Sequence, residues 1–285
     1  MSKLKIAIQK SGRLSENSLR LIQECGIKIP NGGGKLITES TNFPVEILFL
    51  RDDDIPQYVE QKVAHIGIIG ENVLIETRKN LNVIQKLGFS SCRLSLAVAK
   101  EVEYSDLNYF NGKKVATSYP NILKDYFREN NINATIEFIS GSVEIATGIG
   151  LADGICDIVS SGSTLFSNGL KEVERVLSSQ AVLVASENLE SQKQQILEKL
   201  LFRIRSVQRA KESKYILLNA PNKNLDKIVN ILPGMNSPTI LPLAQEGWSS
   251  LHSVISEDKF WDIIEELKAA GAEGILVVPI EKMIL

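Results

Sequence analysis

Apolar residues in the first 185 positions gather in short runs of strand length, and segments of helical periodicity separate these runs. Gly, Pro and Ser cluster between the two kinds of segment and mark the turns. Strands that alternate with helices at this spacing indicate βαβ units and a mainly parallel sheet. The predicted strands lie at residues 4–8, 45–50, 65–69, 93–99, 113–117, 134–139, 155–159 and 181–185.

Two of these runs predict a division of the α/β region into two lobes. The strand at 93–99 is expected to carry the chain into a second lobe, and the strand at 181–185 returns it to the first. The result is an α/β core with two crossovers and a cleft that can close on a ligand, as in receptors of the periplasmic-binding-protein kind. We expect lobe I to span 1–92 and 180–211, and lobe II to span 93–179.

The pattern changes after a long predicted helix at 189–210. Beyond it, strand and helix patterns follow the order βαββαβ, which is the ferredoxin-like order. This compact domain is expected to span 212–285. Because it has no charged cleft motif, sensing or assembly is a more suitable role for it than chemistry.

Composition and charge narrow the classes of function. The 285 residues are 44% hydrophobic and 23% charged, which is ordinary for a globular protein. A net charge of -2 argues against a nucleic-acid partner or an anionic membrane. No apolar run approaches the roughly 18 residues of a membrane span. The N-terminus enters a strand without a signal-like segment, so we expect a cytoplasmic location.

Cysteine and histidine are too sparse for most metal or triad chemistry. Cys25, Cys92 and Cys156 are isolated in apolar patterns and are expected to be core thiols in a reducing compartment. His65 and His252 are too few for a zinc cage or a His-based triad, and His65 at the start of a strand is expected to be structural. Any metal is expected to be Mg²⁺ held mostly by substrate phosphates and water.

The stretch 153–165 has the features of an anion-binding turn. A short strand runs into small hydroxyl residues and a glycine, and a helix is expected to begin near Ser163. Gly162 allows close backbone approach, and the first helical amides point outward. A Walker-type loop is excluded because no Lys follows the glycine. A simple connection would have the same pattern. The candidate phosphate ligands are Ser160, Ser161, Gly162, Ser163 and Thr164.

Two carboxylates, Asp153 and Asp157, lie on the approach to this turn. A carboxylate accepts hydrogen bonds from sugar hydroxyls but repels a phosphate at contact. Together with the turn, they indicate a ribose 5-phosphate as ligand.

Charged side chains follow the first three predicted strands, at the edge where ligands bind in open α/β sheets. Lys10 and Arg13 follow the first strand, although a solvated loop is an equal alternative. Arg51 follows the second and is the preferred anion contact. The acids at 52–54 could chelate Mg²⁺, but such a run more often caps and solubilises a helix. Glu71 follows the third strand.

The chain resembles the ATP phosphoribosyltransferase family, the first enzyme of histidine biosynthesis. The family signature is matched by Glu144, by 150–152 and by 155–165. The resemblance covers nearly the whole chain, including the C-terminal domain of the long, histidine-regulated form. One departure is the segment 76–82, which looks shorter than the family pattern and puts a nearby loop contact in question. Further matching blocks lie at 6–15, 51–56, 67–73, 92–96, 116–120, 210–215 and 237–242.

The resemblance implies transfer of a 5-phosphoribosyl group from phosphoribosyl pyrophosphate to N1 of the adenine of ATP, with Mg²⁺ and release of pyrophosphate. The turn at 160–164 would hold the 5-phosphate, and Asp153 and Asp157 would face the ribose hydroxyls or orient Mg²⁺. Adenine N1 already carries a lone pair, so no strong general base is needed. The implied catalytic residues are Lys10, Arg13 and Arg51, and the implied ATP contacts are Lys10, Arg13 and Glu71.

The resemblance also implies regulation by the C-terminal domain. Histidine would bind there as a feedback inhibitor, AMP would be a second inhibitor, and the protein would shift between an active dimer and an inhibited hexamer. The implied histidine contacts are Asn219, Met235, Thr239, Val254 and Gly274.

Two other functions stay open on the sequence. A cytoplasmic two-lobed sensor could bind a ligand without catalysis, and a phosphoribosyltransferase could act on another base. Incubation with both substrates distinguishes the sensor from the enzyme, because only the enzyme gives an absorbing product. Competition among nucleotides in the same assay shows whether another base is preferred.

Overall fold

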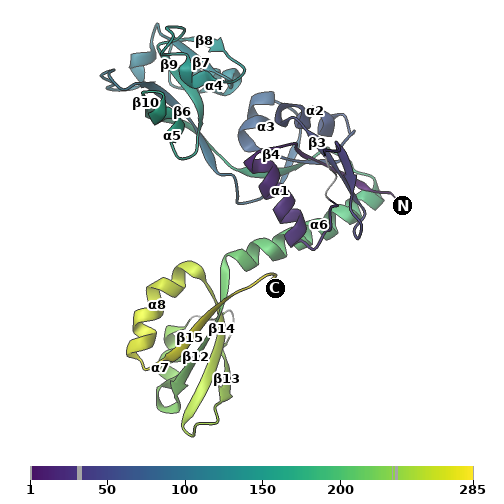
Figure 1. Cartoon of the computed structure of the whole chain (residues 1–285), viewed down its shortest axis with the longest axis vertical. Coiled ribbons are helices and arrows are strands. Elements are labelled where there is room, and N and C mark those ends of the chain that lie inside the picture. Colours follow the sequence, from purple (N-terminus) through teal and green to yellow (C-terminus); the bar gives the residue numbers. More distant parts are fainter. Residues whose placement is uncertain (1, 31–33, 233, 235–236, 285) are drawn as a thin grey trace. The chain divides into compact units, whose positions relative to one another are not determined.

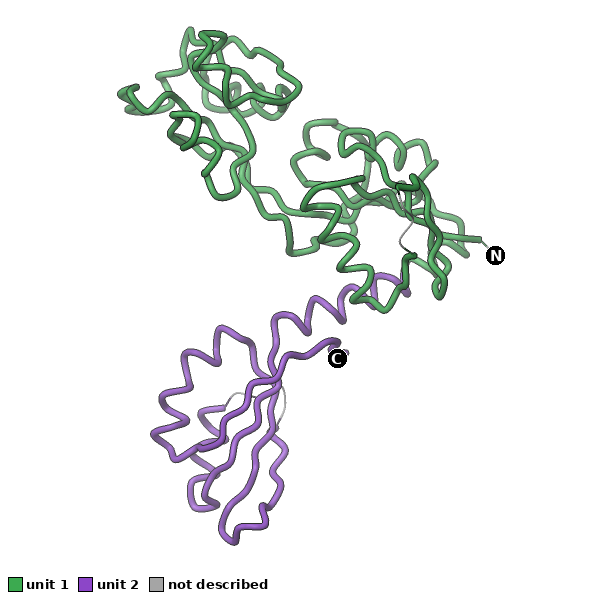
Figure 2. The backbone as a smooth tube through the Cα atoms, viewed as in Figure 1, with its two compact units in different colours: residues 1–197 green, residues 198–285 purple. Residues whose placement is uncertain are grey.

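The computed structural model describes residues 2–30, 34–232, 234 and 237–284. The chain forms two compact units, residues 1–197 and 198–285 (Figure 2). Two of the three sheets lie in the first unit and one in the second (Figure 1). The predicted two-lobed α/β core and C-terminal ferredoxin-like domain are confirmed.

Lobe I is built on a six-stranded sheet of order β2-β3-β1-β4-β11-β5. The neighbours β3, β1 and β4 are parallel, while β2, β11 and β5 run antiparallel to their partners. The strands are β1 (Leu4–Gln9), β2 (Ile37–Glu39), β3 (Val45–Leu50), β4 (Ile66–Gly70), β5 (Asn82–Lys86) and β11 (Ala181–Ala185). The helices are α1 (Arg13–Glu24), the 3-10 turn η1 (Asp52–Asp54), α2 (Ile55–Glu60) and α3 (Glu71–Thr77).

Lobe II is built on a five-stranded sheet of order β10-β6-β9-β7-β8. Here β8, β7 and β9 are parallel, and β6 and β10 are antiparallel. The strands are β6 (Cys92–Ala99), β7 (Lys114–Thr117), β8 (Thr135–Phe138), β9 (Gly154–Val159) and β10 (Leu170–Ser179). The helices are α4 (Pro120–Glu129) and α5 (Ser163–Ser167), with 3-10 turns η2 (Leu107–Phe110) and η3 (Val143–Ile145).

The expectation of mainly parallel sheets is therefore only half right. The sheet of each lobe has a core of three parallel strands, as the alternation of strands and helices in the sequence predicts. The other strands are antiparallel because they include the segments that pass between the lobes in opposite directions. The sequence pattern missed β2, β5 and β10.

The two crossovers lie where the sequence predicted them. The chain leaves lobe I through β5 and enters lobe II in β6, and it returns from β10 into β11. The two connections are hydrogen bonded to each other, because the Leu87 amide donates to the Ala181 carbonyl at 2.9 Å and the Ala181 amide donates to the Phe89 carbonyl at 3.0 Å. The lobes are thus joined by a paired double strand rather than by two loose linkers.

The central strands are apolar on both faces because helices and loops cover both sides of each sheet. In lobe I, Ile6, Ala7 and Ile8 are all buried. In lobe II the core is organised around Phe110, whose ring centroid lies 6.0 Å from that of Phe127. These rigid cores fix the strand ends from which the site is built.

The second unit contains a four-stranded antiparallel sheet of order β13-β14-β12-β15 with two helices. Alternate residues of β12, such as Ile216 and Leu218, pack in a core with residues of the helices. Between them lie half-buried residues, as expected for a sheet with one covered face. After α6 (Ser191–Lys211), which spans the unit boundary, come β12 (Ser213–Pro221), the 3-10 turn η4 (Asn222–Asn224), α7 (Leu225–Ile231), β13 (Thr239–Pro242), β14 (Trp248–Ser256), α8 (Glu257–Ala269) and β15 (Glu273–Pro279).

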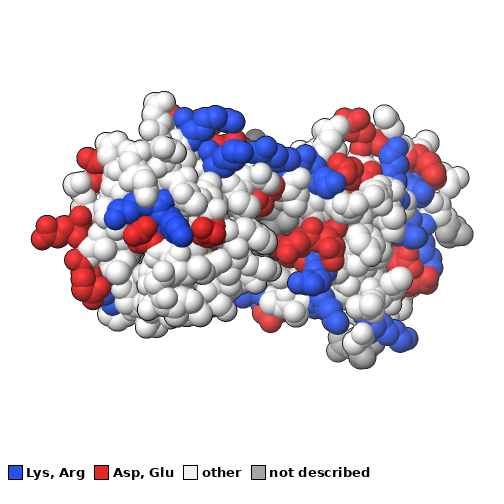
Figure 3. Space-filling model, turned by 90° about the horizontal axis from the view of Figure 1, so that it is seen from above, with Lys and Arg blue, Asp and Glu red and all other residues white. Residues whose placement is uncertain are grey.

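The surface carries both signs of charge. Basic and acidic side chains both appear on the face shown in Figure 3, and the sequence holds similar numbers of each, 32 Lys and Arg against 34 Asp and Glu. Among the residues that the structure describes, no helix is both long and apolar enough to cross a bilayer.

Candidate active site

The predicted anion-binding turn has the expected strand-turn-helix form. Strand β9 ends at Val159 and α5 begins at Ser163, with Gly162 as the N-cap residue. Gly162 has φ +81°, a left-handed backbone conformation that residues other than glycine rarely adopt. Ser160, Ser161, Ser163 and Thr164 are exposed, so their hydroxyls are accessible to a ligand.

An arginine that the sequence analysis did not single out anchors this turn. Arg93 of β6 donates to the Ser160 carbonyl at 3.1 Å and forms a two-pronged ion pair with Glu172 of β10 at 2.5 Å. Hydrogen bonding to Arg93 lowers the pKa of the Glu172 carboxyl, and Ser95 donates to the same group at 2.8 Å. Three strands thereby hold the start of the turn in place.

Asp153 does not lie beside the turn. It precedes β9 at the opposite end of that strand, where its carboxylate accepts from the Lys114 amide at 2.8 Å and lies 3.7 Å from the Lys113 ammonium. A strand of this length separates its two ends by roughly 20 Å. The structure therefore does not support the predicted contact between Asp153 and the ribose. That prediction relied on proximity in sequence, but Asp153 lies at the end of β9 opposite to the turn.

Asp157 lies on β9 near the turn and is half-buried. Burial raises the pKa of its carboxyl, and the nearby Glu144 adds to the effect. Burial and then the charges of Asp157, Asp52 and Asp53 raise the pKa of the Tyr119 hydroxyl. Tyr119 of lobe II thus lies within electrostatic reach of carboxylates from both lobes.

A cavity of about 260 Å³ is lined by residues of both lobes, and we call it the interlobe cavity. Arg13 and Asp52 come from lobe I, and Ile158 and Ser160 come from lobe II. This cavity brings one predicted cation, Arg13, together with the first residue of the predicted phosphate turn.

The other predicted lobe I residues lie apart from Arg13. Glu71 lines a second cavity of about 420 Å³ that also includes Ser160, and its carboxylate pairs with the Lys86 ammonium at 3.5 Å. Lys10 lines a smaller cavity of about 160 Å³. Arg51 is exposed as the N-cap residue of η1. The structure therefore gathers Arg13 and Ser160 at one cavity and Glu71 and Ser160 at another.

Asp52 is a cleft residue that the sequence analysis undervalued. Burial raises the pKa of its carboxyl to about 6, and the adjacent Asp53 contributes. Within the described residues its buried Oδ1 has no hydrogen-bond partner. A buried polar atom of this kind costs about 1–3 kcal/mol. The acidic run suggested helix capping, but none of the described side chains caps the start of η1 or of α2.

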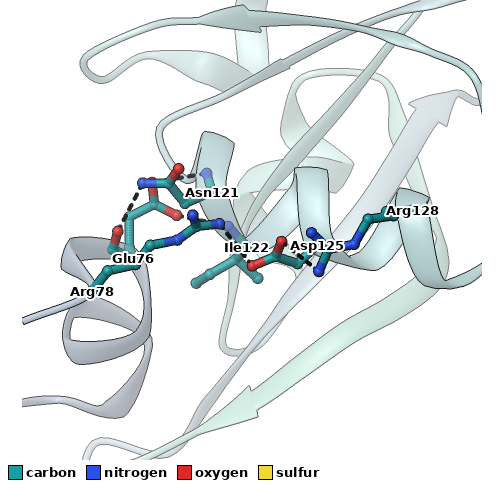
Figure 4. A network of polar contacts seen from close by, with 6 residues as sticks. All are labelled: Glu76, Arg78, Asn121, Ile122, Asp125 and Arg128. Atoms are coloured by element: carbon teal, nitrogen blue, oxygen red, sulfur yellow. Dashed lines mark hydrogen bonds and ion pairs between the residues drawn. The ribbon is translucent and has the colours of Figure 1, made fainter.

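The two lobes contact each other directly through α3 and α4, as Figure 4 shows. The Glu76 carboxylate accepts from the amides of Asn121 at 2.9 Å and Ile122 at 3.0 Å, and the Asn121 side chain donates to the Glu76 carbonyl at 2.9 Å. Arg78 pairs with Asp125 at 2.8 Å. The segment 76–82, which looked short for the family, thus supplies contacts between the lobes.

The residues predicted to bind histidine lie on the sheet of the second unit. Asn219 of β12 and Val254 of β14 alternate with buried residues, so both lie on the face of the sheet away from the helices. Thr239 of β13 pairs with His252, which lies on the same face. At Gly274, with φ +56°, a Cβ would lie 3.3 Å from the Asn219 side-chain amide. Met235 lies outside the described residues.

That face also carries a polar network that the sequence did not reveal. The His252 ring lies 2.9 Å from the Tyr215 hydroxyl through Nδ1 and 3.1 Å from the Ser250 hydroxyl through Nε2. Ser250 and His252 both belong to β14, and Tyr215 of β12 reaches His252 because the two strands pair.

Comparison with known proteins identifies related families over most of the chain. Residues 51–206 match the family model described as ATP phosphoribosyltransferase, and residues 210–282 match the one described as HisG, C-terminal domain. The first match ends at residue 206 and the second begins at residue 210.

Named relatives are similar along their full length. An ATP phosphoribosyltransferase of Cytophaga hutchinsonii is 59% identical over 281 residues, covering 99% of this chain and 98% of that protein. An ATP phosphoribosyltransferase of Phocaeicola vulgatus is 57% identical over 282 residues, covering 99% of this chain and 100% of that protein.

Solved structures match the two-lobed core. A chain of the ATP phosphoribosyl transferase (HisG:HisZ) complex from Thermotoga maritima matches with TM-score 0.60 and 28% identity, covering 71% of this chain and 98% of that one. The arginine-bound Tv2483 protein matches with TM-score 0.53 and 9% identity, covering 73% of this chain and 86% of that one, which shows likeness of fold alone.

Proposed function

This chain belongs to the ATP phosphoribosyltransferase family, and we propose that its reaction takes place in the cleft between lobe I and lobe II. It transfers the 5-phosphoribosyl group of phosphoribosyl pyrophosphate to N1 of the adenine of ATP, which is the first step of histidine biosynthesis. One observation carries the proposed location: Arg13 of lobe I and Ser160 of lobe II line the same cavity. The full-length identity to named transferases disfavours a sensor without catalysis.

The turn at 160–164 is proposed to hold the 5-phosphate of the sugar. Its hydroxyls are exposed, and Gly162 leaves its backbone open to close approach. Asp157, close to the same turn, is the carboxylate available to the ribose hydroxyls. With the phosphate held, C1′ is fixed in place for attack, and fixing two reactants in this way can supply a large part of a rate enhancement.

The cations of lobe I are proposed to contact the polyphosphates of the two substrates. Arg13 lines the interlobe cavity, and Lys10 and Arg51 lie beyond the ends of β1 and β3, the two adjacent parallel strands that precede them. Glu71 is proposed to contact ATP from the end of β4. Closure of the lobes would bring the outer cations toward the phosphates.

We propose Mg²⁺ as the cofactor, carried in by the substrate phosphates. Mg²⁺ usually keeps several waters and binds substrate phosphates together with few protein ligands. When bound, Mg²⁺ would stabilise charge on the departing pyrophosphate. The residues of the turn hold the sugar while that bond breaks.

The second unit is proposed to bind histidine as a feedback inhibitor, with AMP as a second inhibitor and a shift between dimer and hexamer. Asn219, Thr239, Val254 and Gly274 gather on one sheet, three of them on its uncovered face, and such a face suits an interface between subunits. A cytoplasmic location is also proposed, since the free thiols Cys92 and Cys156 fit a reducing compartment.

The location of the reaction is tested by substituting Arg13. In the Arg13→Ala variant, KM for at least one substrate should rise at least tenfold, because a charge-assisted hydrogen bond is worth about 1.5–3 kcal/mol. Arg20→Ala is the matched control, since Arg20 is an exposed residue of the same helix. Equal kinetics of the two variants would place the substrates elsewhere.

A further inference from the structure

The starting observation is the Asp52 carboxylate at the interlobe cavity. Its Oδ1 is buried, and none of the described residues donates a hydrogen bond to it. Asp52 and Arg13 are the only charged residues among the described lining of this cavity. A buried carboxylate oxygen beside a cavity is free to accept a hydrogen bond from a ligand that enters the cavity.

The chemistry of the two substrates limits what that donor can be. A carboxylate repels phosphate groups, and the turn at 160–164 and Arg13 can bind these groups instead. The remaining donors are the sugar hydroxyls and the 6-amino group of adenine. Much of the lining of this cavity is small or apolar, including Leu14, Ile158 and Ala181. Such a lining suits a flat base with a polar edge better than a hydroxyl-rich sugar.

We propose that Asp52 accepts a hydrogen bond from the 6-amino group of the adenine of ATP and stabilises the charge that the ring gains during the reaction. The N1 lone pair forms the bond to C1′, and the bond from C1′ to the pyrophosphate oxygen breaks, its electron pair leaving with pyrophosphate. The adenine ring then carries a positive charge shared between N1 and the amino nitrogen. The proton stays on nitrogen, and Asp52 acts by electrostatic stabilisation. This role rests on the proposed location of the reaction in the interlobe cleft.

The surroundings of Asp52 fit this role. The charged and titratable groups near it are Asp53 on the same turn, Tyr119 before α4, and Arg13 and Cys92 in the cavity lining. Burial and Asp53 raise the pKa of Asp52 to about 6, so the carboxylate is ionised at neutral pH and becomes protonated in mild acid. Its stabilising charge is therefore lost as the pH falls through about 6.

The test compares Asp52→Asn with the wild type and with Asp54→Asn, an exposed acid of the same run. The Asp52→Asn variant should lose about 100-fold in kcat, the size typical for removal of one group that stabilises transition-state charge. The acid limb of the wild-type pH profile near pH 6 should vanish in this variant and persist in Asp54→Asn.

A nucleotide without the amino group identifies the contact. With purine riboside triphosphate in place of ATP, the ratio of wild-type to Asp52→Asn rates should shrink toward one. An unchanged ratio with the two nucleotides would overturn the proposal and assign Asp52 to the sugar or the metal.

A merely structural role is distinguished by thermal melting. Because Asp52→Asn removes a buried charge without a partner, its melting temperature at pH 8 should equal or exceed that of the wild type. A lower melting temperature with unaltered kinetics would also overturn the proposal. The Arg13→Ala experiment fails or succeeds independently, so a wrong location and a wrong role for Asp52 give different results.

Discussion

At the scale of the residue, two buried titratable groups show how environment assigns a role. The Lys5 amide donates to Nδ1 of His65 at 2.8 Å, so this ring is a neutral acceptor with a partner. Burial and the charges of Lys193 and Lys5 lower its pKa to about 4. Asp52 has the opposite situation, since its buried oxygen has no partner in the described chain. The first group is structural, as its sequence position predicted, and the second is available for a ligand.

The His65 environment predicts a dependence of stability on pH. Its folded pKa of about 4 lies below the unfolded value of 6.5, so the unfolded chain binds the extra proton between these values. Stability should therefore fall as the pH drops from 6.5 to 4. In urea unfolding at pH 7 and pH 4.5, the wild type should lose about 2 kcal/mol more than His65→Gln. Parallel losses in both proteins would contradict the assignment. Asp52 is present in both proteins, so its titration cancels.

Glycine geometry gives a matched pair of variants at the phosphate turn. Gly162 and Gly169 flank α5 with φ +81° and +69°, and a Cβ at either position meets at most a loose contact. Alanine at either position should cost about 1–2 kcal/mol of stability through the same left-handed strain. Only Gly162→Ala should also weaken phosphoribosyl pyrophosphate binding, by about tenfold, in calorimetric titration. Equal affinity of the two variants would show that the turn does not hold the sugar phosphate.

At residue level, the local structure of the turn was predicted correctly, whereas contacts that depend on neighbours from other strands were not. The turn at 160–164 is local, and its strand-turn-helix form followed from small residues after an apolar run. Asp153 is also close to the turn in sequence, yet it lies at the end of β9 far from the turn. Arg93 went unrecognised because its significance comes from Glu172 on β10, and Asp52 was considered only as a metal ligand or helix cap because its burial in the cleft could not be foreseen.

At the scale of the element, helix α4 begins in an unusual way. None of the described residues next to it in sequence caps its first amides with a side chain; instead Glu76, from a helix of the other lobe, accepts from two of them. A carboxylate at a helix N-terminus satisfies otherwise free donors and complements the helix dipole. The start of α4 therefore depends on the lobes keeping this contact.

Removal of that cap should be measurable locally. In Glu76→Ala, the exchange of the Asn121 and Ile122 amides with deuterium should accelerate about fivefold, which corresponds to a loss of about 1 kcal/mol. Glu129→Ala is the control, since Glu129 is exposed at the other end of the same helix. If exchange at the start of α4 is equally fast in both variants, Glu76 does not stabilise this helix end.

Elements with a strong apolar pattern were predicted well, and those with mixed patterns were missed. The ranges of β3 and β11 agree with the predicted strands at both ends. In β10, charged residues interrupt the run and two register shifts break the alternation, so no period of two was visible. The short β2 and the partly exposed β5 likewise gain their strand form from pairing rather than from composition.

At the scale of the whole molecule, the paired crossovers define how the two lobes are connected. Gly88 and Ser90, in the first crossover, both have positive φ angles, +73° and +51°. The sequence predicted two crossovers and a cleft, but it could not show which residues meet across that cleft. Arg13 and Ser160 are 147 positions apart and line one cavity only in the folded chain.

Coupling between the transfer reaction and the proposed histidine site can be tested only in the intact protein. If histidine on the sheet of the second unit lowers affinity for ATP and phosphoribosyl pyrophosphate by some factor, thermodynamic linkage requires that bound substrates lower the affinity for histidine by the same factor. A tenfold effect in each direction corresponds to about 1.4 kcal/mol of coupling. Calorimetric titration of histidine, with and without a substrate and a non-reactive analogue of the other, measures this factor directly.

The control for this experiment is a pair of asparagines in the second unit. Asn219→Ala should lose at least tenfold in histidine affinity, because Asn219 lies beside Gly274 on the proposed binding sheet, whereas Asn230→Ala, exposed on α7, should keep the wild-type affinity. If the wild type binds histidine equally well in the presence and absence of substrates, then the second unit binds the amino acid without regulating the cleft. If both variants bind like the wild type, the site lies on another surface. Only a loss confined to Asn219→Ala, together with equal factors in the two directions, ties feedback inhibition to this sheet.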